Sequence, residues 1–193
     1  TANPAAALHY YLGVALIKEG QLEAAANTFN KGIQLDEKEP LNYVGRGYLS
    51  ILNNNAEKAK IDFDKALSIS KSKNVAVLQN IGEAYLEGKR TDEALGVLSK
   101  ANALDNQDAT TLVLLGDAYL QQNNGGLAVT SYEKAATFQP KSAQPHYKIG
   151  LVYLRSKNFA AAQAALTKAI EVDPSYTLAY KELGELYYQQ KQA

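Results

Sequence analysis

Glycine returns at an almost constant interval along the whole chain, and this period restricts the possible folds more than any other feature of the sequence. Four of the five steps are 34 residues and one is 35, through Gly13, Gly47, Gly82, Gly116, Gly150 and Gly184. Three further series keep the same phase: alanine at 25, 59, 94, 128 and 162, a large apolar residue at 29, 63, 98, 132 and 166, and a small residue at 32, 66, 101, 135 and 169. Four series in phase indicate an internal repeat.

Each repeat reads as two helices joined by a short turn. In the segment VAVLQNIGEAYLEG, Leu78, Ile81 and Tyr85 fall on one helical face. The turn EGKRT follows, and then DEALGVLSKANAL, in which Ala94 and Leu98 share the inner face. Breaks such as KEGQ, NNNA, QNNGG and SKNF recur at the same phase in the other repeats. The pattern therefore predicts an all-α chain of helical hairpins.

The repeated glycine has a cost that needs a reason. Glycine inside a helix is less favourable than alanine by roughly 1 kcal/mol. We interpret the glycine of each first helix as the place where the second helix of the same repeat packs closely, which a larger side chain would prevent. On this interpretation the phased alanines supply the matching flat surface.

On these residues the chain resembles the tetratricopeptide repeat family, whose 34-residue pattern runs through an aromatic residue, Leu-Gly, Tyr, Ala, Phe, Ala and Pro. The fourth repeat matches best, with Leu115, Gly116, Tyr119, Ala128, Tyr132, Ala135 and Pro140. The second repeat departs at Arg46, where Leu is expected, and the first has Leu16 in the Tyr position. Tyr85, Tyr119, Tyr153 and Tyr187 occupy that Tyr position and are expected in the core.

The resemblance implies a right-handed superhelical α-solenoid of five helix-turn-helix units, with the first helices lining a concave face. We expect one array over residues 1–193, with units at about 6–39, 40–74, 75–108, 109–142 and 143–176. A single helix at about 177–190 matches the first half of a unit and is expected to cap the array.

The composition argues against several other functions. Twenty Lys and Arg balance 20 Asp and Glu, which does not favour a nucleic-acid partner, and no apolar run is long enough for membrane insertion. Without cysteine there are no disulfides or thiolate metal sites. No catalytic or phosphate-binding motif is present.

The residue types that often serve catalysis or metal binding have structural explanations here. His9 and His146 both fall in an aromatic position, and the acidic pairs Asp62/Asp64 and Asp92/Glu93 are expected to be solvated. We therefore expect no enzyme, no cofactor and no metal.

The family resemblance also indicates where a partner protein would bind. First-helix positions that face the concave groove should be apolar and aromatic in the first two repeats, acidic in the middle and basic in the fifth. The predicted partner-binding residues are Tyr10, Tyr11, Val14, Val44, Tyr48, Leu52, Glu83, Glu87, Asp117, Tyr147, Lys148 and Arg155. An alternative is that Tyr10 and Tyr11 pack on a preceding helix of a longer array.

Three functions fit these expectations. The first is a non-catalytic scaffold that binds a partner protein segment in its groove. The second is a self-associating structural module, and the third is a regulatory segment of a larger enzyme or of an envelope assembly protein. Lys and Asn at the positions that bind the carboxylate of heat-shock chaperones in related repeats are replaced here, for example by Tyr10 and Val14, which disfavours that partner. Asn- and Lys-rich loops suggest a bacterial source, and the sequence does not distinguish cytoplasm from cell envelope.

Overall fold

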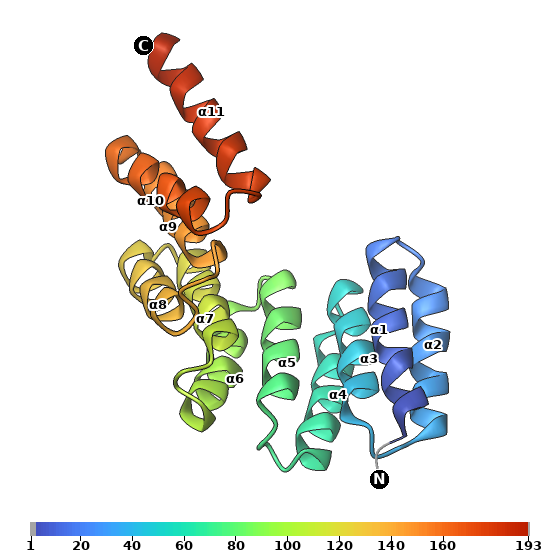
Figure 1. Cartoon of the computed structure of the whole chain (residues 1–193). Helices are drawn as coiled ribbons and strands as arrows, with labels where there is room; N and C mark the ends of the chain where they lie inside the picture. The colour runs from blue at the N-terminus through green and yellow to red at the C-terminus, as the bar shows by residue number, and fades with distance from the viewer. Residues whose placement is uncertain (1–2, 193) are drawn as a thin grey trace. The chain divides into compact units, whose positions relative to one another are not determined.

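The computed structural model describes residues 3–192, and over this range it contains eleven α-helices and no strand (Figure 1). The helices are α1 (Pro4–Lys18), α2 (Leu22–Leu35), α3 (Pro40–Leu52), α4 (Ala56–Ile69), α5 (Val75–Glu87), α6 (Thr91–Leu104), α7 (Ala109–Gln121), α8 (Gly125–Phe138), α9 (Gln144–Arg155), α10 (Phe159–Val172) and α11 (Thr177–Gln192). The prediction of an all-α chain of five helical hairpins and one further helix is confirmed.

The helices divide into two compact units. Unit 1 spans Thr1–Leu104 and holds the first three hairpins, α1 to α6. Unit 2 spans Asp105–Ala193 and holds α7 to α11. Within each unit the two helices of a hairpin pack on each other, and neighbouring hairpins pack through α2 and α3 in unit 1 and through α8 and α9 in unit 2. That all five hairpins form one right-handed array stays a prediction.

The repeat glycine faces the large apolar residue that lies 16 positions later on the second helix. A Cβ atom added at Gly116 would overlap the ring of Tyr132, which is completely buried. The other pairs of this kind are Gly13 with Phe29, Gly47 with Phe63, Gly82 with Leu98, and Gly150 with Leu166. The interpretation of the glycines as points of close helix packing is confirmed in all five hairpins. The expectation that the phased alanines supply the facing surface is wrong, because the large apolar residue of the second helix lies there.

The turn inside every hairpin contains one residue in the left-handed backbone conformation. These residues are Gly20, Asn54, Lys89, Asn123 and Lys157, with φ between 55° and 77°. The next backbone N–H reaches back five residues to a carbonyl of the first helix, as from Asn124 to Tyr119 at 2.8 Å, which closes the helix in a Schellman motif. Three of the second helices then start with an asparagine N-cap: Asn55, Asn124 and Asn158. Turn and cap together fix where each second helix begins.

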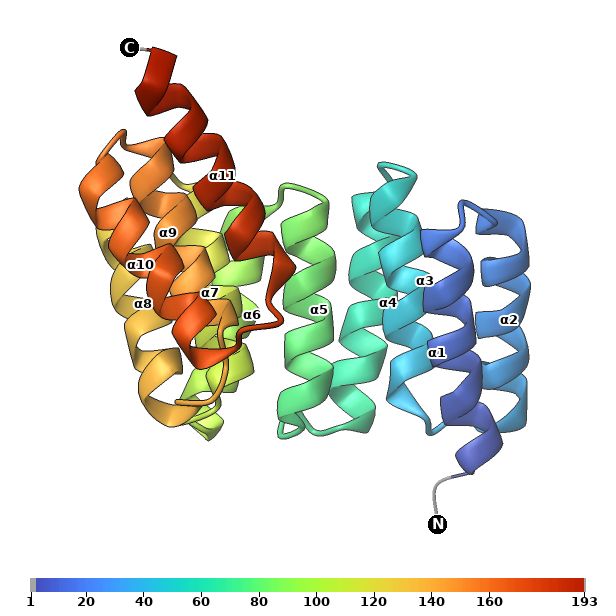
Figure 2. The ribbon, with the colours of Figure 1, turned by 45° about the horizontal axis from the view of Figure 1, so that its top comes forward.

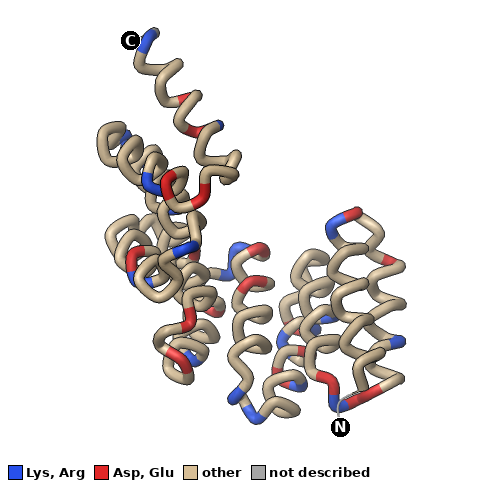
Figure 3. The backbone as a smooth tube through the Cα atoms, viewed as in Figure 1, with Lys and Arg blue, Asp and Glu red and all other residues tan. Residues whose placement is uncertain are grey.

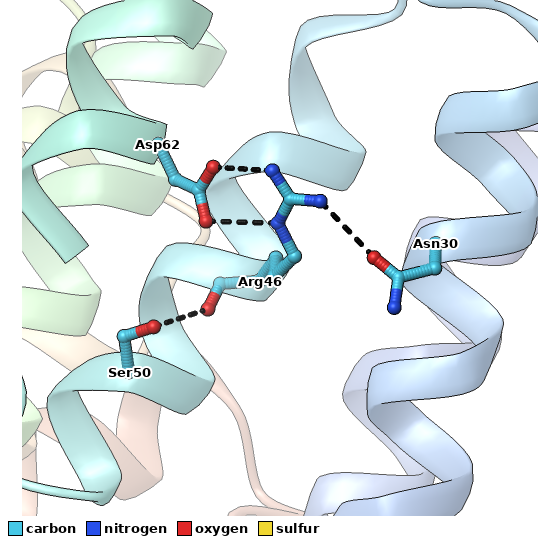
Figure 4. Close-up of polar contacts among 4 residues, drawn as sticks. All are labelled: Asn30, Arg46, Ser50 and Asp62. Carbon is cyan, nitrogen blue, oxygen red and sulfur yellow. Dashed lines mark hydrogen bonds and ion pairs between the residues drawn. The ribbon is translucent and has the colours of Figure 1, made fainter. Parts of the chain in front are cut away.

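Arg46, which departs from the family pattern, bridges three helices of unit 1 (Figure 4). Its Nε and Nη2 donate to the two carboxylate oxygens of Asp62 on α4 at 2.9 and 2.7 Å. Its Nη1 donates to Oδ1 of Asn30 on α2 at 3.0 Å, and the guanidinium lies over the ring of Tyr43. The expectation that Asp62 is solvated is wrong, because this carboxylate is buried and bound by Arg46. Asp64 is exposed and pairs with Lys60.

The first and last helices leave repeat positions open that are buried in the hairpins between them. Leu8 and Leu12 on α1 are 66% and 54% exposed, whereas their counterparts in the third repeat, Val77 and Ile81, are completely buried. On α11, Ala179, Leu183 and Leu186 are buried in the core of unit 2, as expected of a capping helix.

The expectation that Tyr187 lies in the core is wrong, because its side chain is 45% exposed. The physical reason is that α11 has no second helix after it within residues 3–192. Gly184 shows the same lack, since a Cβ atom added there would meet nothing within 4 Å.

Candidate functional site

The first helices of unit 1 form a pocket on one side of the unit. α1 contacts α3, and α3 contacts α5, so the three helices follow one another in Figure 2. Between them lies a hollow of about 190 Å³. We call it the tyrosine pocket and define it by its lining residues: Tyr10, Tyr11, Val14, Lys18, Val44, Gly45, Tyr48, Asn80, Glu83, Ala84 and Glu87.

One wall of the tyrosine pocket is aromatic. The rings of Tyr10 and Tyr11 meet edge to face with centroids 5.3 Å apart, and Tyr10 also lies 6.4 Å from the ring of Phe29. Tyr10 is buried while Tyr11 is 61% exposed, so Tyr11 offers most of its ring to solvent. Val44, which also lines the pocket, is buried. Residues predicted for the aromatic N-terminal part of the groove thus line one hollow of unit 1.

Two tyrosine hydroxyls tie the aromatic wall to α5. Tyr10 donates to Oδ1 of Asn80 at 2.8 Å, across 70 residues of sequence. Asn80 is held in place by its own amide, which donates to the carbonyl of Ala76 at 2.7 Å. Tyr48 donates to the carboxylate of Glu87. These bonds between α1, α3 and α5 orient the polar atoms of the pocket.

The tyrosine pocket has a negative electrostatic environment. Burial is the main cause that raises the pKa of Tyr10, and the negative charge of Glu83 raises it further. Burial, the hydrogen bond to Glu87 and the charges of Glu87 and Glu83 raise the pKa of Tyr48. Both phenols therefore stay neutral donors, and the charges near them are two carboxylates and the ammonium group of Lys18.

The predicted site residues of unit 2 are engaged in contacts of their own. Asp117 accepts a hydrogen bond from Tyr132 at 2.7 Å and binds the ammonium group of Lys148 at 2.8 and 3.0 Å. The ring of Tyr147 lies 5.4 Å from that of Tyr176. Arg155 donates to the carbonyl of Leu120 and to Oδ1 of Asn123. These side chains stabilise contacts between neighbouring helices of unit 2.

Seven of the predicted binding residues therefore meet in one pocket: Tyr10, Tyr11, Val14, Val44, Tyr48, Glu83 and Glu87. Leu52 is not among the lining residues, although its side chain is exposed. The predicted partner-binding residues did not include four of the lining residues: Lys18, Gly45, Asn80 and Ala84. Ala84 lies two positions after the repeat glycine, beside the groove position of Glu83.

Charged residues of both signs are interspersed along both units (Figure 3). No group of three or more metal-ligating side chains occurs among residues 3–192. Within the same described part of the chain, none of the helices has the length and apolar character needed to cross a membrane.

Models of the repeat family match most of the chain. A tetratricopeptide repeat model matches residues 6–39 and 42–73, a TPR repeat model matches residues 116–157, and a further tetratricopeptide repeat model matches residues 147–193. The chain belongs to the tetratricopeptide repeat family. Proteins with this fold generally act as non-catalytic scaffolds for protein–protein interaction. A comparison with curated protein sequences finds no match.

Solved tetratricopeptide repeat structures share the fold. TTC0263 of Thermus thermophilus is 17% identical with a TM-score of 0.73, over 95% of this chain and 100% of that chain. YrrB, described as a TPR protein with an unusual peptide-binding site, is 23% identical with a TM-score of 0.61, over 91% and 90%. PilF of Pseudomonas aeruginosa is 20% identical with a TM-score of 0.66, over 98% and 97%.

Proposed function

We propose that this chain is a non-catalytic scaffold and that the tyrosine pocket binds a segment of a partner protein. The observation that carries the proposal is the concave, tyrosine-lined surface between α1, α3 and α5. Tyrosine is enriched among the residues that contribute most to binding at protein interfaces. A solved structure of the same fold, YrrB, is described as having an unusual peptide-binding site, which supports a protein segment as the kind of ligand.

The size of the tyrosine pocket favours a protein segment over a small molecule. Pockets for small ligands and cofactors typically enclose about 300–1,000 Å³, whereas this hollow measures about 190 Å³. A hollow of that size suits one or two side chains that project from a longer segment. The rest of the segment would then lie along the neighbouring first helices.

A selection experiment tests this proposal. A library of random twelve-residue peptides displayed on phage is selected on the immobilised full chain. Tyr11→Ala removes an exposed ring of the pocket, and Tyr188→Ala is the matched control, because Tyr188 is 66% exposed on α11 and outside the pocket. We expect the enriched peptides to bind Tyr11→Ala at least about tenfold more weakly and to bind Tyr188→Ala like the wild type. Equal binding to all three proteins would contradict the proposal.

Self-association is a second candidate function, favoured by the exposed leucines of α1. Leu8 and Leu12 present apolar side chains at positions that other hairpins cover, and exposed apolar patches often mark interaction surfaces. If a second copy covers them, sedimentation of the full chain should show concentration-dependent dimers, and Leu8→Gln with Leu12→Gln should remove them. A wild-type chain that is monomeric at all concentrations would exclude this function.

A further inference from the structure

Two acidic residues of the tyrosine pocket lie on one face of the same helix. Glu83 and Glu87 are four residues apart on α5, and both line the pocket. Residues at this spacing lie on the same face of a helix, and like charges there oppose helix formation. A positively charged group between the two carboxylates would remove this repulsion.

The carboxylate of Glu87 can accept more hydrogen bonds than the one that the pocket supplies. An ionised carboxylate offers about four lone-pair sites, and Tyr48 uses one of those on Glu87. Tyr48 thereby fixes the direction of this carboxylate before any ligand arrives. The rings of Tyr11 and Tyr48 supply aromatic surface in the same pocket, on which a planar cation can stack.

Unit 2 contains an internal example of the same recognition. Asp117 directly follows its repeat glycine, as Glu83 follows Gly82, so the two carboxylates occupy equivalent repeat positions. Asp117 binds an ammonium group, that of Lys148, at 2.8 Å and also accepts a tyrosine hydroxyl. A carboxylate at this position of the fold can therefore hold a cation next to a tyrosine.

We propose that the tyrosine pocket recognises an arginine side chain of the partner segment, with its guanidinium between Glu83 and Glu87 and stacked on the tyrosine rings. This inference rests on the proposed function and adds the chemistry of the bound residue. Arginine fits better than lysine because its planar fork of donors reaches two carboxylates and stacks on aromatic faces. Lys18 also lines the pocket, so the two glutamates leave one negative charge that the arginine would balance.

The peptides enriched on the full chain test the inference. We expect them to share an arginine at one fixed position with apolar neighbours. A synthetic peptide of that sequence is then compared with its citrulline analogue, which keeps the shape and loses the charge. The citrulline peptide should bind the wild type about tenfold more weakly or worse. In the variant with Glu83→Gln and Glu87→Gln the two peptides should bind within about threefold of each other.

A glutamate outside the pocket provides the matched control. Glu133→Gln changes one exposed glutamate on α8, outside the pocket, and should keep the full preference for arginine. Enriched peptides without a shared basic residue, or equal binding of the arginine and citrulline peptides, would overturn the arginine inference. If those peptides still lose affinity for Tyr11→Ala, the proposed function stands. If they bind Tyr11→Ala unchanged, both proposals fail.

Discussion

Arg46 and Asp62 face each other across α3 and α4 through two nearly parallel hydrogen bonds of 2.9 and 2.7 Å. In the third repeat the same two positions are occupied by Ile81 and Val97. The same two positions thus hold apolar residues in one hairpin and an ion pair in another. Because Asp62 is buried, replacement of one residue of the pair would leave the other without its partner, so the effects of the two replacements depend on each other.

A double-mutant cycle should reveal this dependence. Asp62→Val removes the carboxylate and leaves Arg46 half-buried without its anion, and we expect it to lower the unfolding free energy by about 2–4 kcal/mol. The variant with Arg46→Ile and Asp62→Val copies the third repeat and should lose less than about 1 kcal/mol, because an apolar pair can replace a buried ion pair. Arg46→Ile alone completes the cycle, and urea unfolding followed by circular dichroism measures all three variants against the wild type. Additive losses would contradict the coupling.

The close packing at the repeat glycine makes a second prediction. Gly116→Ala should lower the unfolding free energy by about 1–2 kcal/mol, because overpacking against buried Tyr132 outweighs the gain of roughly 1 kcal/mol in helix propensity. Gly96→Ala is the control. Gly96 lies inside α6, a Cβ atom there would meet nothing within 4 Å, and the same substitution should stabilise by up to about 1 kcal/mol. Thermal unfolding of the two variants should move in opposite directions.

Lys157 adopts φ 58° in the turn of the fifth hairpin, where the first hairpin has glycine. The left-handed conformation costs a non-glycine residue about 1–2 kcal/mol. Glycine avoids this cost, but it also gives the unfolded chain more conformational entropy, which offsets part of the gain. Lys157→Gly should therefore raise the unfolding free energy by about 0.5–1 kcal/mol. Lys134→Gly, inside α8, is the matched control and should lower it by about 1 kcal/mol. A loss in both variants would show that the turn does not impose this conformation.

Tyr132 makes the stability of unit 2 depend on pH above about 10. Burial and the neighbouring Asp117 raise the pKa of this phenol in the folded chain. Above about pH 10 the unfolded chain loses the proton that the folded chain retains, so the unfolding free energy falls as pH rises. Tyr132→Phe should be less stable at about pH 8 by about 1–2 kcal/mol, because it loses the hydrogen bond to Asp117, and its stability should fall less steeply at higher pH. Parallel pH profiles would contradict this.

The repeat period determined much of what could be predicted. The phased glycines predicted close packing of the two helices of each hairpin, although not that Tyr132 would be the residue that faces Gly116. The groove positions of the resemblance included Tyr10, Tyr48 and Glu87, which line one pocket in unit 1. Both follow from local helix geometry that each repeat copies.

The remaining features depend on departures from the repeat. Asp62 was expected in solvent because its sequence position alone does not show its pairing with Arg46. The two residues are 16 positions apart, the same separation as between each repeat glycine and the large residue that it faces. Tyr187 was expected in the core because it occupies the Tyr position of the repeat. It is exposed because no second helix follows α11 within residues 3–192 to cover it. Lys148 was assigned to a partner, yet Asp117 within the same unit binds it. The pattern of one helix does not indicate these features, because each depends on what a second helix places beside the residue.

NMR can show directly whether a selected peptide binds in the tyrosine pocket. The peptide is added to the isotopically labelled full chain, and the amide shifts are followed residue by residue. We expect the largest changes in amide chemical shift at the lining of the tyrosine pocket, including the amides of Val14, Gly45 and Ala84. Largest changes on the second helices α2, α4 and α6, or on α11, would contradict it.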